Sequence, residues 1–333
     1  MVELALATAQ PPPPMSDLTL TATRSARSLV AVVARFSRWR GVLMLVLAGV
    51  AGFVAALVVT LVGWATSELH TLLFALPVDS RLSQQTALVS PILAVVPAVG
   101  GVLVGLSIYL ARRFRTRPPV DPIEANAVYG GKMSFRESVI VTLQTVLSSS
   151  FGASVGLEAG YTQMSSSIAS HIGSRLSLRR NEIRTLVGCG AAGAIAAAFN
   201  APFTGAFYGF ELIIGLYSVG LLAPVVTASL VASFTARWLG AVQTPIVLES
   251  VNPLSGADVF PFLILGVISG GVAIGTMLAV AQIERGFTLS RLPQYVRPVV
   301  GGIAIMVLAK RSAVSKPAVS KPDVSKPDLP KIA

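Results

Sequence analysis

An uninterrupted apolar run of 24 residues at positions 41–64 is the feature that most constrains the fold of this chain. As an α-helix it would be about 36 Å long at roughly 1.5 Å per residue, which is enough to cross a bilayer with some tilt. The whole sequence has the same character, with 53% hydrophobic and 12% charged residues and a mean hydropathy of +0.73. One water-soluble core of this size needs far less apolar surface, so the sequence predicts an integral membrane protein.

The formal net charge of +11 is distributed as a membrane topology signal. The 26 Lys and Arg residues gather in short clusters between apolar runs, with five at 22–40, six at 112–137 and four at 175–184. By the positive-inside rule these clusters face the cytoplasm, so we expect a cytoplasmic amino terminus in the plasma (inner) membrane. The lipid bilayer is the expected partner of this basic charge, and nucleic acid is not.

The cysteine and histidine content excludes several classes of protein. One cysteine, Cys189, cannot form a disulfide framework, and two distant histidines, His70 and His171, do not make a metal site of familiar spacing. The sequence therefore predicts neither a metal site nor a cofactor.

We expect three regions along the chain. Residues 1–40 combine a cytoplasmic tail with a basic amphipathic helix on the membrane surface. Residues 41–309 form the membrane domain, with further clear spans at about 87–111, 219–236 and 259–281. Residues 310–333 repeat a Val-Ser-Lys-Pro unit three times and should be a disordered Ser/Lys/Pro tail.

The middle of the membrane domain contains its two informative acidic residues. A Ser-rich segment at 138–157 runs into the glycine-dense stretch GASVGLEAGYTQ, which indicates two helices meeting inside the membrane. Only Glu158 in this stretch and Glu211 further along fall inside apolar or glycine-rich membrane segments. An ionisable group at membrane depth costs roughly 2.5 to 3.5 kcal/mol on insertion scales, so it needs a partner, a water-filled pocket or a proton.

The neighbours of Glu158 suggest an anion site. Gly152, Gly156 and Gly160 remove side-chain bulk and leave amide N–H groups free, and a helix beginning near Tyr161 would add orphan donors and a partial positive charge. Such a site binds a bare anion, and the Glu158 carboxylate could occupy it and leave when protonated. The alternative is that Glu158 is an ordinary capping carboxylate in the first turn of a helix.

Two motifs resemble those of the CLC chloride channel and transporter family. GASVGLEAGYTQ is similar to the family's G-x-S-x-G-[RK]-E-G-P motif, and GCGAAGAIAAAFNAPFTGAFYGFELI is similar to its next helix pair, at matching spacing. The resemblance covers about 41–304 and implies an all-α integral membrane fold with tilted and broken helices. It places Glu158 at the gating glutamate and Gly156, Leu157, Ala159 and Gly160 where backbone amides line the anion pathway. It also implies a homodimer through about 203–236, with chloride or a similar small anion as the transported partner.

Several departures from the family bear on its mechanism. Leu157 replaces a basic residue, which weakens anion attraction, and residues 118–122 read Pro-Pro-Val-Asp-Pro where the family has a serine that holds the central anion. Many exchangers of the family carry two adjacent glutamates where this chain has Glu211 and Leu212. Leucine cannot carry a proton, so we expect channel-like conduction gated by voltage or pH, with a weakly coupled chloride/proton antiporter as the alternative. Glu211 is interpreted as structural, bonded to backbone amides at a helix boundary, and Tyr208 and Tyr217 are interpreted as core or interfacial aromatics.

The carboxyl end departs furthest from the family. Its members consist of two inverted repeats, and the G-x-F-x-P loop and pore-lining tyrosine of the second repeat do not occur in this sequence. We therefore expect a longer chain truncated inside the second repeat. The remaining alternative is a transport-incompetent membrane fragment that assembles with full-length subunits. An enzyme is not expected, because Glu158 and Glu211 have no His, Lys or metal partner at membrane depth.

Overall fold

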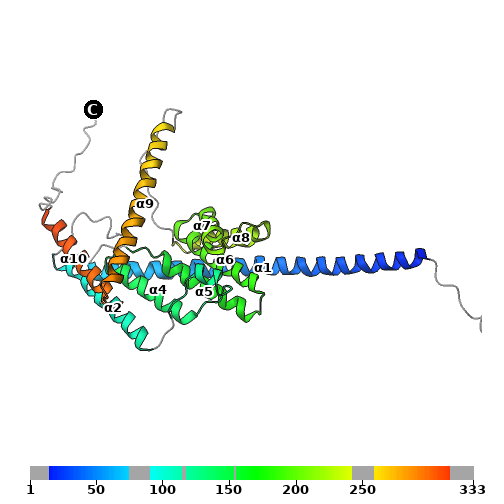
Figure 1. Ribbon diagram of the computed structural model, residues 1–333, viewed down its shortest axis with the longest axis horizontal. Helices are drawn as coiled ribbons and strands as arrows, with labels where there is room; N and C mark the ends of the chain where they lie inside the picture. Colours follow the sequence, from blue (N-terminus) through cyan, green and yellow to red (C-terminus); the bar gives the residue numbers. More distant parts are fainter. Residues whose placement is uncertain (1–14, 75–90, 115–117, 154, 242–258, 316–333) are drawn as a thin grey trace, which may run out of the picture.

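The computed structural model describes residues 15–74, 91–114, 118–153, 155–241 and 259–315 (Figure 1). Within these residues the secondary structure is helical, without strands. The helices are, in chain order, α1 Met15–Phe74, the 3-10 helix η2 Pro91–Val95, α2 Val96–Arg113, α3 Pro122–Ala127, α4 Phe135–Ser150, α5 Glu158–Arg175, α6 Arg180–Phe199, α7 Pro202–Tyr208, the π-helix η3 Gly209–Ile214, α8 Val219–Trp238, α9 Val259–Leu289 and α10 Arg297–Ser315.

Five helical segments of the described chain are long and apolar enough to cross a membrane. This confirms the prediction of a multi-pass, all-α membrane protein, and each span predicted from hydropathy overlaps one of them. Residues 87–90 of the predicted second span lie outside the described residues. The segments are Trp39–Phe74, Leu93–Arg113, Arg180–Phe199, Gly220–Trp238 and Val259–Leu289.

Helix α1 extends the first predicted span in both directions. It continues without a break from Met15 to Phe74, so the stretch at 22–40 is the beginning of the same helix and not a separate element. Its predicted place on the membrane surface stays a prediction. Residues 1–14 of the expected tail lie outside the described residues.

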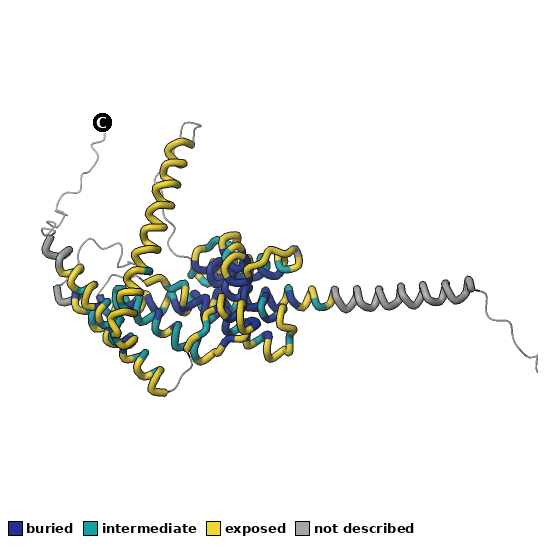
Figure 2. The backbone as a smooth tube through the Cα atoms, in the orientation of Figure 1, coloured by how far each residue is buried: buried dark blue, intermediate teal, exposed yellow. Residues whose placement is uncertain are grey.

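Helix α6 lies at the centre of the packed helices, in contact with α1, α5, α7 and α8. All of its residues from Thr185 to Ala198 are buried, and Figure 2 shows them in the dark blue middle of the molecule. Most of them are alanine or glycine. Small side chains let neighbouring backbones approach closely: a Cβ on Gly190 would meet the backbone of Ser165 and Ser166 in α5 at 2.7 to 3.0 Å.

Helix α10 packs against α2 in a separate contact. The two meet through Gly101 and Gly302, since a Cβ on Gly302 would lie 3.2 Å from the Gly101 Cα. Helix α10 continues past Lys310 to Ser315. The boundary between membrane domain and tail at this position stays a prediction. Residues 316–333 of the tail lie outside the described residues.

Helix α9 has no buried residue among its 31, although its span has a hydropathy of 2.2 (Figure 2). A helix that is apolar on every face is stable in lipid or under further helices, and not in water. Its exposure therefore agrees with a membrane environment.

Candidate functional site

The α4–α5 connection forms the glycine-dense break predicted from the sequence. Helix α4 ends at Ser150, and Gly152 follows with a φ of +84°, a left-handed conformation that glycine adopts without strain. Its N–H donates to the Ser149 carbonyl at 3.1 Å. The chain can then reverse and begin α5 at Glu158, which brings two helix ends together as expected for a broken segment.

Glu158 is the first residue of α5 and is half-buried. It lies among the N–H groups that the first turn of a helix leaves without intrahelical acceptors. Its side chain folds back over Gly156, because a Cβ built on that glycine would fall on the Glu158 Oε2 atom. Gly156 thus leaves the space that the carboxylate occupies.

The other residues assigned to the anion pathway lie around this turn in different environments. Gly156 and Ala159 are exposed and Leu157 is half-buried. Gly160 is buried, and a Cβ built on it would lie 3.1 to 3.4 Å from the Thr145 side chain of α4. The structure therefore gathers all of them at the start of α5, with Gly160 turned toward α4.

Several polar side chains attach α5 to its neighbours. Gln163 donates to the Val120 carbonyl at 2.8 Å and to the Ser138 hydroxyl at 3.2 Å. The hydroxyl of Ser166 donates to the Val187 carbonyl of α6 at 3.1 Å. Buried hydroxyls that find carbonyl acceptors fix the orientation of the helix, so the start of α5 is held from several sides.

The Pro-Pro-Val-Asp-Pro stretch at 118–122 leads into the short helix α3. Pro122 occupies its first turn, and the Asp121 carboxylate accepts a hydrogen bond from the Glu124 N–H at 2.7 Å. This is an N-cap with proline at the first helical position. The departure from the family's serine therefore places an exposed carboxylate at this helix start.

Tyr208, at the end of α7, was interpreted from the sequence as a core or interfacial aromatic. Its half-buried ring packs against the core cluster that contains Tyr161 and against the cluster that contains Ala125. The structure therefore agrees with a role in the core.

Glu211 and Leu212 both lie exposed on the π-helix η3. The Glu211 carboxylate accepts a hydrogen bond from the Tyr217 hydroxyl at 2.7 Å. That hydrogen bond raises the pKa of the Tyr217 phenol, because it stabilises the protonated form. The interpretation of Glu211 as a structural carboxylate stays a prediction. Its hydrogen-bond donor in the structure is the Tyr217 hydroxyl, whereas the sequence interpretation expected backbone amides.

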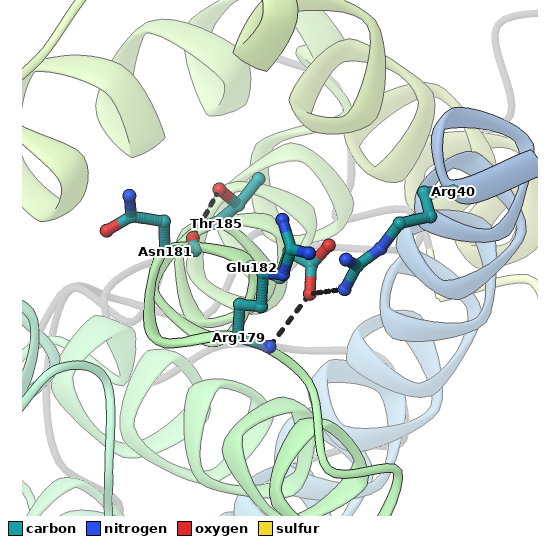
Figure 3. A network of polar contacts seen from close by, with 5 residues as sticks. All are labelled: Arg40, Arg179, Asn181, Glu182 and Thr185. Carbon is teal, nitrogen blue, oxygen red and sulfur yellow. Dashed lines mark hydrogen bonds and ion pairs between the residues drawn. The ribbon is translucent and has the colours of Figure 1, made fainter. Parts of the chain in front are cut away.

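The basic cluster at 175–184 connects α5 to α6 and forms a polar network with α1 (Figure 3). Arg40 of α1 forms an ion pair with Glu182 at 2.9 Å. The same Glu182 oxygen accepts the Arg179 N–H at 2.8 Å, which caps the start of α6. Nearby, the Thr185 hydroxyl donates to the Asn181 carbonyl at 2.9 Å.

Comparisons with known proteins agree with the motifs. A family model described as "Voltage gated chloride channel" matches residues 100–322. A ClcB-like chloride channel protein of Ralstonia nicotianae is 31% identical over 222 residues, covering 65% of this chain and 52% of that one. The voltage-gated ClC-type chloride channel ClcB of Yersinia pseudotuberculosis is 28% identical over 254 residues, covering 75% of this chain and 61% of that one. The chain thus spans about half the length of the curated relatives it matches.

Two solved structures share the fold. The crystal structure of a CLC-type fluoride/proton antiporter matches with a TM-score of 0.64 at 25% identity, over 80% of this chain and 64% of that one. A slow cyanobacterial Cl⁻/H⁺ antiporter matches with a TM-score of 0.60 at 22% identity, over 81% of this chain and 63% of that one. These matches confirm the arrangement of helices.

Proposed function

This chain belongs to the voltage gated chloride channel family, and we propose that it conducts chloride or a similar small anion passively across a membrane, gated by Glu158. The observation that carries the proposal is the position of the Glu158 carboxylate, which starts α5 and folds back over Gly156. A tethered anion in that place competes with a mobile one for the same helix start.

Protonation of Glu158 would open the pathway. The charged carboxylate is attracted by the partial positive charge at the start of α5, and the neutral acid is not. Once the acid leaves, the amides of Gly156, Leu157, Ala159 and Gly160 can face an anion instead. Anion flux should therefore rise as the pH falls, and membrane voltage should act on the gate through the charge that moves.

Leu212 supports passive conduction over strict exchange. It stands beside Glu211 where a second titratable group would be needed, and its side chain cannot bind a proton. The matched ClcB relative is described as a voltage-gated channel, whereas both solved structures are antiporters. An antiporter with weak proton coupling is therefore the runner-up within the same class.

Location and assembly follow from the same family. We propose a multi-pass protein of the bacterial inner membrane with a cytoplasmic amino terminus, supported by the five apolar segments and the basic clusters. A homodimer through about 203–236 is supported by large exposed apolar side chains on α7 and α8. They include Phe203, Phe207, Leu222 and Phe234.

A second candidate function rests on helix α9. Within the described residues none of its 31 positions is buried, although its span is strongly apolar. It would then be a subunit that assembles with full-length family members and does not conduct alone.

Chloride efflux from liposomes that contain the purified chain tests the proposal. The wild type should release chloride faster at acidic than at neutral pH, and Glu158→Gln should release it at a rate that no longer depends on pH. Glu284→Gln, which neutralises an exposed carboxylate on α9, is the matched control and should behave as the wild type. If neither the wild type nor Glu158→Gln releases chloride although both are well inserted, the conduction proposal is contradicted and the assembly role is favoured.

A further inference from the structure

Helices α2 and α4 form an open groove of about 300 Å³ between them. Its lining is mostly apolar, with Leu110 and Phe114 from the end of α2 and Ile140, Leu143 and Leu147 from α4. This volume lies at the lower end of the range of protein sites that hold small molecules. Because α2 belongs to one of the spanning segments, a hydrophobic ligand can reach the groove from the bilayer.

The two helices run in opposite directions along the groove. Gly100 of α2 lies against Phe151, just after α4. Further along α2, the Ser107 hydroxyl accepts a hydrogen bond from the Gln144 amide at 3.1 Å. Positions increase along α2 as they decrease along α4, so the end of α2 lies beside the first turn of α4. Ser107 and Gln144 both line the groove, so this part of it is uncharged.

Arg136 is the charged residue of the groove and lies at its opposite end, in the first turn of α4. The partial positive charge of a helix start disfavours a cation there. Within the described chain, the Arg136 side chain forms no ion pair or hydrogen bond. Glu137 shares this turn but does not line the groove. The stability of α4 therefore does not explain the position of Arg136.

Further positive charge lies at the same end of the groove. Arg112 and Arg113 occupy the last turn of α2, where the negative end of the helix favours a cation. Arg112 donates to the Gln294 side chain, and Arg113 is exposed. The forked donors of arginine match the oxygens of a phosphate group. An apolar groove with such a cationic end is complementary to a lipid with an anionic headgroup.

We propose that the groove holds one acyl chain of an anionic phospholipid, whose phosphate lies at Arg136. Between Arg136 and Leu147 the lipid chain can lie along about 16 Å of α4, at roughly 1.5 Å per residue. Burial of its methylene groups beside Ile140 and Leu143 supplies affinity, and the arginines select the charge of the headgroup. The end of α2 belongs to a basic cluster that the positive-inside rule assigns to the cytoplasm, so this lipid comes from the cytoplasmic leaflet. The site does not depend on the proposed function, and its test measures no anion flux.

The unfolding temperature of the purified chain in detergent, measured against added lipid, tests the site. A ligand that binds only the folded protein raises this temperature as its concentration increases. Phosphatidylglycerol should raise the unfolding temperature of the wild type. Arg136→Gln should need about fivefold more of this lipid for the same shift, since one basic residue at a membrane surface contributes about that factor in affinity. Arg136→Lys keeps the charge and should retain most of the effect.

Two further variants separate the groove from the surface around it. Lys132→Gln removes an exposed charge shortly before α4 and outside the groove, so it should match the wild type. Ile140→Trp places a larger side chain in the groove and should abolish the shift with phosphatidylglycerol.

Three results would overturn the site. Equal losses in Arg136→Gln and Lys132→Gln would show a diffuse attraction of lipid to the basic surface. An equal shift with phosphatidylcholine would show that the headgroup charge is not recognised, and an equal shift with inorganic phosphate would show that the acyl chain is not. A disulfide-linked dimer of Leu143→Cys in phosphatidylglycerol bilayers would show that a second copy of the chain covers the groove.

Discussion

Arg40 and Glu182 form an ion pair with 2.9 Å between Arg40 Nη2 and Glu182 Oε2, although 142 positions separate them in the chain. It joins the first spanning helix to the first turn of α6, which is the most buried of the five spanning segments in the described chain. Both side chains are less than one third exposed, at 27% and 19%, so water screens the pair only in part.

Removing Glu182 should lower the free energy of unfolding more than removing Arg40 does. Arg40→Gln breaks the ion pair and should cost about 1 kcal/mol. Glu182→Ala also removes the acceptor of the Arg179 N–H and should cost about 2 kcal/mol. Thermal unfolding in detergent measures both. Arg179→Gln keeps its backbone N–H and is the control, and an equal effect of all three changes would contradict this account.

Gly52 should tolerate no side chain, while Gly49 on the same helix should. A Cβ on Gly52 would fall on the Ala228 carbonyl of α8, whereas one on Gly49 would lie 4.0 Å from a Val231 methyl. Gly52→Ala should therefore lower the free energy of unfolding by about 1–3 kcal/mol. Gly49→Ala should be neutral or stabilise the helix by up to about 1 kcal/mol. Unfolding temperatures of the two variants, measured side by side, decide the matter; equal values would refute the close α1–α8 contact.

Gly156→Ala should open the anion gate. The new methyl group would occupy the space of the Glu158 carboxylate and force it out of its place at the start of α5. Chloride efflux at neutral pH should then approach the rate of Glu158→Gln and lose its dependence on pH. Gly63→Ala, which meets nothing within 4 Å, serves as the control. Retained acid activation in Gly156→Ala would mean that the carboxylate does not need this space.

Cross-linking should distinguish the proposed dimer interface from other exposed surfaces. Leu222 on α8 and Val272 on α9 are similarly exposed, at 54% and 63%. Leu222→Cys should give a disulfide-linked dimer in the membrane and Val272→Cys should not. The native Cys189 is fully buried and does not interfere. Equal cross-linking at both positions would argue against an interface through about 203–236.

The sequence predicted the spans and the break before α5 because hydropathy and glycine content are local signals. The apolar run at 41–64 lies within helix α1, and the glycines around Glu158 lie at the break between α4 and α5. Lys310 and Arg311 reduce hydropathy without stopping α10, because a local charge does not end a helix.

The contacts of Tyr208 could not be predicted from the sequence, because they depend on tertiary packing. In the sequence, Tyr208 is one aromatic residue in an apolar stretch. Folding brings its ring against two core clusters, one that contains Tyr161 of α5 and one that contains Ala125 of α3. The exposed position of Glu211 and its tyrosine donor also follow from the π-helix, which no local pattern indicated.

The buried alanines and glycines of α6 have a consequence for how proteins of this architecture can diverge. Where α6 carries alanine or glycine, its side chains have few atoms left to give up, and close backbones such as that of Ser165 leave no room for larger ones. Variation that changes transport properties should then accumulate at the helix ends, where Glu158 lies. Helix α6, which carries no candidate site residue, is therefore the helix on which amino-acid substitutions are most restricted.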